Sequence, residues 1–375
     1  MSPLAEIIRD QIRARGPVSF AWFMEQALYH PELGYYCSAR KRIGRGGDYY
    51  TNVSVGKAYG QILAEQLIEM WEILGRPVPF SIVEQGVEDG QLAVDILEAL
   101  RISHEELFQC LRYLIVEPIA RKQEEQRARL ESIGRVSWVN EIAELGPITG
   151  VFLSNELLDA LPVHLVEFSD GKWCELLVQN AESDFEFARS PGLDPQLAAA
   201  LRDIQVMPPY RTEVNLAARE WVRAVAQKLS DGFVLIVDYG YPKAEYYSAE
   251  RREGTLTCYS QHRKSYNPLA RPGELDITAH VDFSAVAETA NRAGLSVTAF
   301  TDQHHFMVGA VESRLRSLEK QIAVSGQSAP DAEFLRRYRT LMHPGNLGLT
   351  FKFLLLGKKV NGTPSGFRYA RETAL

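Results

Sequence analysis

The chain opens with two short stretches in which apolar residues recur at helical spacing. Within residues 3–15, the apolar positions 4, 7, 8 and 12 fall on one side of a helix. A second helix is predicted to begin near Ser19, whose hydroxyl suits an N-cap, and to end before His30, because Pro31 follows it. We interpret these two helices as an N-terminal cap on the rest of the fold.

From residue 80 onwards, short apolar and β-branched runs alternate with amphipathic segments. Such runs are typical of strands buried on both faces, and their alternation with helices indicates a parallel sheet in an α/β fold. The predicted strands are residues 81–86, 111–118, 136–141, part of 150–164, and 232–241, and the predicted helices are 55–74, 90–100, 118–133 and 212–229.

The last part of the chain departs from this alternation. A helix over 283–293 and a strand over 295–303 are followed by helices between 310 and 342 and by a strand over 349–358. Residues 165–178 are predicted to form a β-hairpin with its turn at Ser169-Asp170-Gly171. We therefore expect a cap and loop at 1–75, an α/β core at 76–310 with an insertion at about 162–210, and a C-terminal part at 311–375.

Composition narrows the class of protein. The net charge of -7 over 375 residues argues against a general nucleic-acid binder, and no apolar run reaches the ~18 residues that a membrane span needs. The four cysteines show no zinc-binding spacing, so no metal site is expected. The N-terminal helix carries Glu6 and Asp10, which are unusual in a transit peptide, so we expect a cytoplasmic protein.

The stretch FSIVEQGVEDGQLAVDIL, residues 80–97, carries the main chemical signal. It is a strand ending near Glu84, a turn through Gly86 and Gly90, and a helix start, which is an arrangement that binds nucleotide-like ligands. The turn contains Glu88 and Asp89 where a dinucleotide would place its pyrophosphate. Two carboxylates disfavour an anion there, so NAD and FAD are poor candidates.

S-adenosyl-L-methionine (SAM) fits this turn better, because it carries a sulfonium and an ammonium but no phosphate. The turn and Glu84 offer a platform for the amino-acid part of SAM. Glu117, at the end of the second strand, can accept hydrogen bonds from both ribose hydroxyls. Asn140 or Glu141, at the end of the third, can reach the adenine edge. The order of these polar residues on successive strands predicts a SAM site.

The chain resembles the MidA-like family of SAM-dependent methyltransferases over nearly its whole length. The motifs that carry the resemblance are GGDYYT (46–51), IVEQGVEDGQL (82–92), LIVEP (114–118), SNELLDALPVH (154–164), VDYGY (237–241), GTLTCYSQHR (254–263) and PGELDITAHVDF (272–283). The family includes a mitochondrial protein arginine methyltransferase that assists assembly of respiratory complex I. The resemblance implies a class I, seven-stranded Rossmann-like sheet.

Two stretches depart from the family pattern. Val87 and Glu88 replace a Pro-Gly pair in the glycine turn, and residues 51–54 read TNVS where the family has Thr-Ser-Pro-Glu. The Glu88 side chain narrows the room over the turn. It either points outward and leaves SAM binding intact, weakens that binding, or marks a subgroup with another ligand.

Candidate catalytic residues follow the fourth strand. Asn155, Glu156 and Asp159 lie where the carboxyl ends of the strands meet, and the resemblance places them beside the methyl group. Asn155 could equally cap a helix, with Asp159 in its first turn.

Three further candidates come from the other motifs. Asp48 and Thr51, within GGDYYT, are implied by the resemblance to lie over the cofactor. His280 is a candidate general base, although a structural histidine is the commoner case.

The sequence thus predicts a SAM-dependent methyltransferase. The resemblance implies that the acceptor is arginine of a protein substrate, with a respiratory-complex subunit as one possible partner. Two alternatives stay open: a small-molecule methyltransferase, and a non-catalytic assembly or scaffold protein that retains the fold. The sequence does not indicate an oligomeric state.

Overall fold

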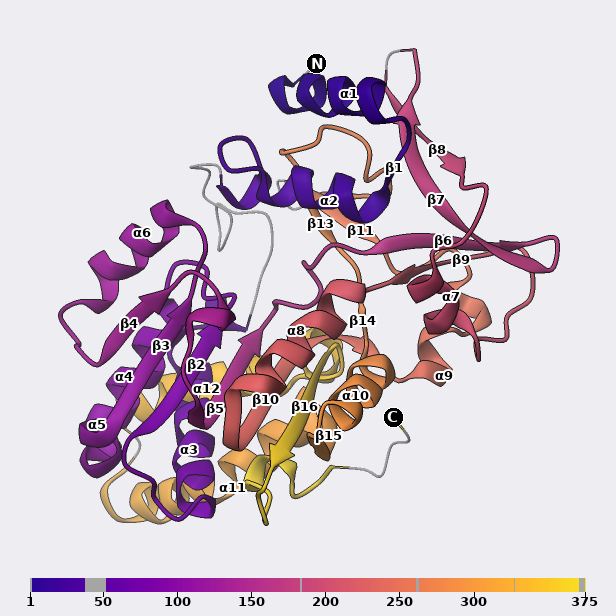
Figure 1. Ribbon diagram of the computed structural model, residues 1–375. Coiled ribbons are helices and arrows are strands. Elements are labelled where there is room, and N and C mark those ends of the chain that lie inside the picture. The colour runs from indigo at the N-terminus through magenta and orange to yellow at the C-terminus, as the bar shows by residue number, and fades with distance from the viewer. Residues whose placement is uncertain (1, 38–51, 183, 261–262, 327, 371–374) are drawn as a thin grey trace. The chain divides into compact units, whose positions relative to one another are not determined.

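The computed structural model describes residues 2–37, 52–182, 184–260, 263–326, 328–370 and 375 (Figure 1). The chain forms two compact units, each built from three segments. Unit 1 comprises Met1–Tyr49, Leu158–Trp221 and Tyr241–Val286, and unit 2 comprises Tyr50–Leu157, Val222–Gly240 and Ala287–Leu375. The domain limits predicted at residues 75 and 310 stay predictions.

Unit 2 is organised around a sheet whose seven main strands run in the order β15–β16–β10–β5–β2–β3–β4 (Figure 1). The pairs formed by β10, β5, β2, β3 and β4 are parallel, whereas β16 runs antiparallel to both β10 and β15. The strands are β2 (Phe80–Gln85), β3 (Leu111–Val116), β4 (Val136–Val139), β5 (Ile148–Asn155), β10 (Leu229–Tyr241), β15 (Ser296–Asp302) and β16 (Phe351–Lys358). The predicted α/β fold is confirmed, and these seven strands form the main path of a sheet of eight.

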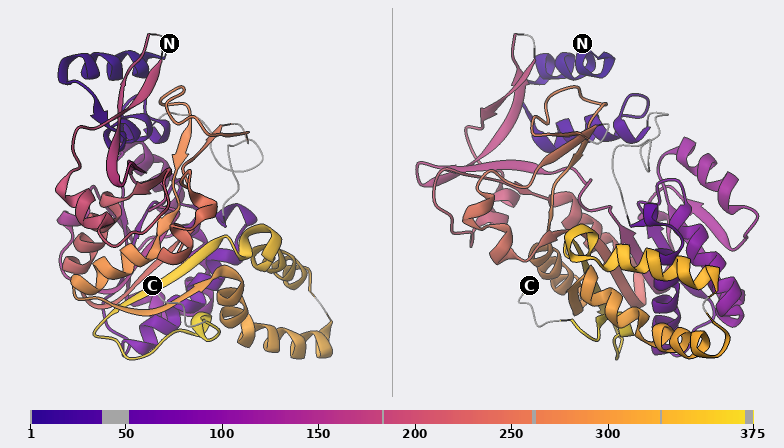
Figure 2. Two further views of the ribbon diagram at one scale, coloured as in Figure 1. Left: turned by 90° about the vertical axis from the view of Figure 1, so that its right-hand side faces the viewer. Right: turned by 180° about the vertical axis from the view of Figure 1, so that it is seen from behind.

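The apolar side chains of the helices of unit 2 pack against those of the sheet and form one continuous hydrophobic core. The helices that lie wholly in unit 2 are α3 (Ala58–Ile73), α4 (Gln91–Ser103), α5 (Glu105–Cys110), α6 (Ala120–Leu130), α11 (Gln303–Ser325) and α12 (Ala329–Met342). Seen from behind, the orange pair α11 and α12 lie side by side, and apolar side chains from both belong to this core (Figure 2).

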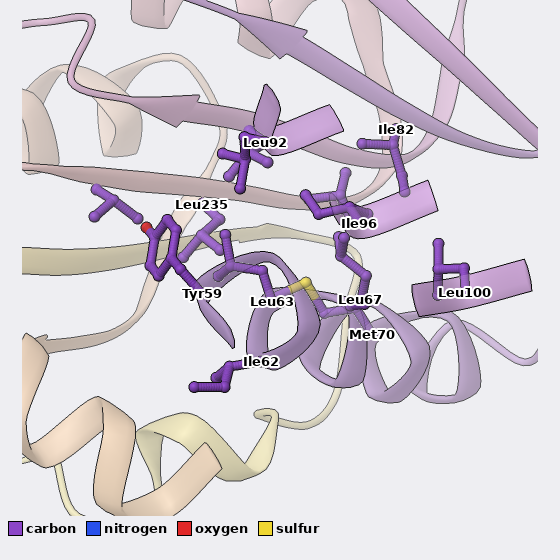
Figure 3. Packing of buried hydrophobic residues seen from close by; sticks show 14 of the residues in the cluster. Tyr59, Ile62, Leu63, Leu67, Met70, Ile82, Leu92, Ile96, Leu100 and Leu235 are labelled. Carbon is purple, nitrogen blue, oxygen red and sulfur yellow. The ribbon is translucent and has the colours of Figure 1, made fainter. Parts of the chain in front are cut away.

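Helices α3 and α4 pack against each other and against the sheet. Their buried side chains interdigitate beside Ile82 of β2 and Leu235 of β10 (Figure 3). At the crossing point α3 carries Gly60, where a Cβ atom would lie only 2.4 Å from the Cβ atom of Asp95 on α4. The glycine therefore permits a close approach of the two helices that a larger residue would prevent.

Unit 1 contains two smaller antiparallel sheets. One has the order β1–β7–β6–β9 with β8 paired to β7, and the other has the order β12–β11–β13. Their strands are β1 (Val18–Ser19), β6 (His164–Ser169), β7 (Lys172–Asn180), β8 (Phe185–Arg189), β9 (Tyr210–Val214), β11 (Thr257–Ser260), β12 (Arg263–Ser265) and β13 (Asp276–Thr278). The hairpin predicted at 165–178 is confirmed as β6 and β7.

The two predicted N-terminal helices belong to unit 1. Helix α1 covers Pro3–Arg15, and α2 covers Phe20–Tyr29 with the Ser19 side chain accepting a hydrogen bond at its start, as predicted. Two shorter helices, α7 (Pro195–Leu201) and α9 (Lys243–Tyr246), follow later in the unit.

Two helices cross the boundary between the units, α8 (Leu216–Lys228) and α10 (Phe283–Arg292). The prediction of a helix from residue 212 is wrong at its start. Residues 212–214 belong to β9, because they pair with β6 residues 164–166 across a ladder that the local sequence does not reveal. Within the described residues, no helix is long and apolar enough to span a bilayer.

Candidate functional site

The glycine turn joins β2 to α4 as the sequence predicted. Gly86 and Gly90 both have positive φ, 84° and 87°, a region that favours glycine. A Cβ atom on Gly86 would lie 3.2 Å from Leu157 Cβ and 3.6 Å from the Asn155 carbonyl oxygen. The turn therefore packs directly against the end of β5, where candidate catalytic residues lie.

Glu84 lies inside the sheet beneath the turn. Its side chain is buried, and one carboxylate oxygen accepts a hydrogen bond of 2.6 Å from the Tyr113 hydroxyl on β3. Burial raises the pKa of Glu84 to about 7, with the Tyr113 hydrogen bond opposing the rise. Because this carboxylate is buried, any effect of Glu84 on the cofactor acts through the glycine turn.

Glu88, the departure from the family pattern, is bound by α6. It has a positive φ of 49°, and its carboxylate lies 2.6 Å from the Lys122 ammonium, whose side chain is 9% exposed. Its neighbour Asp89 pairs with Arg129 at 3.1 Å. Both acids of the turn are therefore neutralised by cations of α6.

Glu117 follows β3 and is 6% exposed. One carboxylate oxygen accepts from the Ile119 amide at 3.0 Å, and the other accepts from the Gln126 amide group at 3.1 Å. Burial raises the pKa of Glu117, whereas the positive charge of Lys122 opposes that rise. The carboxylate is fixed in place beside the turn by these contacts.

Asn140 and Glu141 follow β4 and are both exposed. Gln123 of α6 connects Asn140 to the previous strand end, since its amide group donates to Asn140 Oδ1 at 3.1 Å and to the Glu117 carbonyl at 2.7 Å. The predicted cofactor residues Glu117 and Asn140 are therefore brought to one edge of the sheet.

Asn155 and Glu156 end β5 and are linked to each other. The Asn155 amide group donates to Glu156 Oε1 at 3.1 Å, and Glu156 has a positive φ of 54°. Its backbone amide donates to the Val237 carbonyl of β10 at 2.9 Å, which holds this unusual conformation.

Tyr59 is a member of the site that the sequence did not single out. It lies on the buried side of α3, and its hydroxyl donates a 2.6 Å hydrogen bond to Asn155 Oδ1. Burial and the charge of Glu156 raise the pKa of Tyr59 well above its usual value, so it stays a donor. A tyrosine within the apolar stripe of α3 was the signal available in the sequence.

The remaining candidates are distributed differently. Asp159 and His280 belong to unit 1, where the Ala279 amide donates to the Asp159 carbonyl at 3.0 Å and the His280 amide donates to Thr255 Oγ1 at 3.0 Å. The backbone thus brings the segments of these two residues together. Asp48 and Thr51 lie outside the described residues.

Comparison with curated proteins reveals relatives that match nearly the whole chain. A fruit fly protein, "Protein arginine methyltransferase NDUFAF7 homolog, mitochondrial", is 28% identical over 94% of this chain and 84% of its own length. The human "Protein arginine methyltransferase NDUFAF7, mitochondrial" is 24% identical over 95% of this chain and 83% of its own.

The expected cytoplasmic location is contradicted by these relatives, which are named as mitochondrial proteins. The two acids of the N-terminal helix were a poor guide to location, because the pattern of this helix reflects packing. Leu4, Ile8 and Ile12 are buried within unit 1, and the Arg9 guanidinium donates to the carbonyls of Ala181 and Asp184.

A solved structure shares the whole fold. The protein from Burkholderia thailandensis, bound to S-adenosyl-homocysteine, is 30% identical, covers 98% of this chain and 95% of its own, and has a TM-score of 0.85. The model of the family described as "Putative S-adenosyl-L-methionine-dependent methyltransferase" matches residues 62–301. The predicted enzyme class and the predicted cofactor, SAM, are confirmed, and the chain belongs to this family of SAM-dependent methyltransferases.

Proposed function

We propose that this enzyme transfers the methyl group of SAM to an arginine side chain of a protein. The observation that carries the proposal is the Asn155–Glu156 pair at the end of β5, directly beside the glycine turn. The names of the fly and human relatives support arginine as the acceptor.

Glu156 suits an arginine acceptor for electrostatic reasons. A guanidinium stays protonated in water and presents a planar fork of donors, which a carboxylate binds well. SAM supplies an electrophilic methyl group on its sulfonium. Glu156 would orient one guanidinium nitrogen, which forms a bond to the methyl carbon as the carbon–sulfur bond breaks and S-adenosyl-homocysteine leaves. Glu156 would also stabilise positive charge until the alkylated nitrogen gives its proton to water. Asp159 and His280 stay predicted catalytic residues.

The residues for the cofactor follow from the contacts above. Gly86 and Gly90 leave the backbone of the turn accessible, Glu117 is the acceptor for the ribose hydroxyls, and Asn140 is the candidate for the adenine edge. Glu84, Glu141, Asp48 and Thr51 remain predicted cofactor residues. The donor set suits SAM, because the cations of α6 that contact the described turn, Lys122 and Arg129, are each paired with an acid and so are poorly placed to bind a phosphate.

A scaffold function would be favoured if Glu88 blocked the turn. Its carboxylate instead binds Lys122 on α6. This contact favours the possibility that Glu88 points outward and leaves SAM binding intact. We therefore favour an active enzyme over a non-catalytic scaffold.

The test is the substitution Glu156→Gln. It keeps the size of the side chain and its hydrogen bond to Asn155 but removes the charge, so we expect unchanged affinity for SAM and loss of methyl transfer by about 100-fold or more. Calorimetry measures the affinity. Transfer is measured with radiolabelled SAM and an extract of cells that lack this enzyme. Glu124→Gln, on the exposed side of α6, is the matched control.

Mass spectrometry of the labelled extract identifies the acceptor. We propose a respiratory-complex subunit as the protein that carries the methylated arginine, on the family resemblance. Label found on small molecules or on residues other than arginine overturns the acceptor assignment. Full transfer by the Glu156→Gln variant removes Glu156 from the mechanism.

A further inference from the structure

Helix α6 hides two polar residues that its sequence would place in solvent. Its sequence, ARKQEEQRARL, is almost entirely polar, yet Lys122 is 7% exposed and Gln126 is fully buried. Lysine and glutamine are rarely buried without a specific partner. Their spacing of four residues puts both on one face of the helix.

Gln126 joins three segments of unit 2. Its amide group donates to the Glu88 carbonyl at 2.9 Å and to Glu117 Oε2 at 3.1 Å. Its own oxygen accepts from the indole nitrogen of Trp138 on β4 at 2.9 Å. One side chain therefore fixes the glycine turn relative to the carboxylate after β3, with β4 as support.

Lys122 provides the charge that this arrangement needs. Its ammonium contacts the Glu88 carboxylate at 2.6 Å and also acts electrostatically on Glu117. The negative charge of Glu88 disfavours the ionised form of Glu117, and the Lys122 ammonium favours it.

The ionised form of Glu117 matters for counting acceptors. A carboxylate has about four acceptor positions, and the described contacts with Ile119 and Gln126 use two. Two positions remain for the two hydroxyls of a ribose. A proton on the carboxyl group would occupy one of them and would turn an acceptor into a donor.

We propose that Lys122 and Gln126 are positioning residues for the cofactor, which hold the glycine turn and the Glu117 side chain in one buried unit. This inference rests on Glu117 as the ribose acceptor. It also explains how Glu88 is tolerated in the turn, because the Lys122 ammonium compensates the negative charge of both Glu88 and Glu117.

The groups around Glu117 act on its pKa in both directions. Around Glu117, burial and the charge of Glu88 raise its pKa, whereas the Lys122 ammonium and the hydrogen bonds from Ile119 and Gln126 lower it. Other charges on the described part of these elements have partners elsewhere: Asp89 pairs with Arg129, Arg121 pairs with Glu125, and Arg127 lies over the ring of Trp138.

The experiment measures the affinity of the full chain for S-adenosyl-homocysteine by calorimetry at about pH 6 and about pH 8.5. In Lys122→Met, loss of the cation raises the pKa of Glu117. A protonated Glu117 offers one acceptor position fewer to the ribose. We therefore expect Lys122→Met to bind S-adenosyl-homocysteine more weakly than the wild type, with a larger loss of affinity at the lower pH than at the higher pH. Lys57→Met, which removes an exposed lysine paired with Glu98, is the control.

The double variant Glu88→Gln/Lys122→Met separates charge from shape. Removing the second carboxylate should restore most of the affinity at the lower pH, which a purely structural defect would not permit. The single variant Glu88→Gln provides the same test if Lys122→Met does not fold, since it should bind at least as tightly as the wild type at the lower pH.

The outcomes distinguish this inference from the proposed function. If the wild type binds S-adenosyl-homocysteine and Lys122→Met binds it as tightly as the wild type at both pH values, this inference is overturned and the proposed function stands. A loss that neither pH nor Glu88→Gln reverses also overturns it. A wild-type chain that binds no S-adenosyl-homocysteine overturns the cofactor site itself.

Discussion

At the scale of single residues, one hydroxyl determines how the end of β5 is arranged. Tyr59 donates to Asn155 Oδ1, which leaves the amide nitrogen of Asn155 to face Glu156. Without that donor, either orientation of the amide would be open. The tyrosine therefore orients the catalytic candidate through an intermediate, and it is a positioning residue.

Tyr59→Phe tests this role. The change leaves the buried Asn155 oxygen without its described donor, which should lower the free energy of unfolding by ~1–2 kcal/mol. We expect kcat to fall while the Kd for SAM stays the same, because the turn is not altered. Urea denaturation and single-turnover kinetics measure the two effects. Tyr338→Phe, at a buried tyrosine of α12, is the comparison. If kcat is equal in the two variants, Tyr59 contributes only to packing and has no positioning role.

Glu84 makes the stability of the protein depend on pH. Its pKa is about 7 in the folded state, against an ordinary value of 4.5. As the pH rises from about 4.5 to about 7, the unfolded state loses its proton first, so the free energy of unfolding falls. The full loss, about 3 kcal/mol, is reached above pH 7.

The variant Glu84→Gln removes this titration while its oxygen can still accept from Tyr113. We expect it to be more stable than the wild type at about pH 8, and the difference to shrink at about pH 5. Denaturant unfolding at both pH values measures this, with Glu124→Gln as the control. A difference that does not change with pH would show that Glu84 is ionised in the folded state across this range.

At the scale of elements, the strands and the turn were predictable from the sequence, whereas the contacts that complete the site were not. The ends of β2, β3 and β5 carry their polar residues where the alternation of apolar runs placed them. Tyr59 and Asn155 are 96 residues apart, and Gln126 reaches Glu88 across 38 residues. Such partners depend on helix packing, which local periodicity does not encode.

Residues 212–214 show the same limit for secondary structure. Taken alone, the segment continues into an amphipathic helix, but its ladder with β6 decides its conformation. The glycine turn was predictable because strand, glycines and helix start are all local signals.

The packing of α3 on α4 gives a prediction for Gly60. Alanine favours a helix by ~1 kcal/mol over glycine. Here, however, the added Cβ would lie 2.4 Å from Asp95 Cβ, so the helices must separate. We expect Gly60→Ala to lower the free energy of unfolding by ~1–3 kcal/mol in spite of that propensity.

Urea denaturation measures the change. Gly146→Ala is the matched control, because a Cβ there meets no atom of the described residues within 4 Å. A Gly60→Ala variant as stable as this control would mean that α3 and α4 adjust to the extra methyl group.

At the scale of the whole molecule, the predicted site residues are distributed over both units. The glycine turn, Glu117, Asn140, Asn155 and Glu156 all belong to unit 2, whereas Asp159 and His280 belong to unit 1. Each unit has a core cluster of its own, one around the large sheet and a smaller one around Val166 and Leu197. The cofactor candidates of the described residues can thus be assembled by unit 2 alone.

The position of β16 has a consequence for how the protein is made. This strand comes late in the chain, yet it lies between β10 and β15. During synthesis, β15 therefore has no neighbouring strand in the described sheet, and β10 presents an open edge of unpaired amides, until residues 351–358 have emerged. A nascent chain in that state is prone to aggregation and is a substrate for chaperones. The predicted site residues at the ends of β2, β3 and β5 are synthesised before β16, so the sheet that carries them is completed only after residues 351–358 have been added.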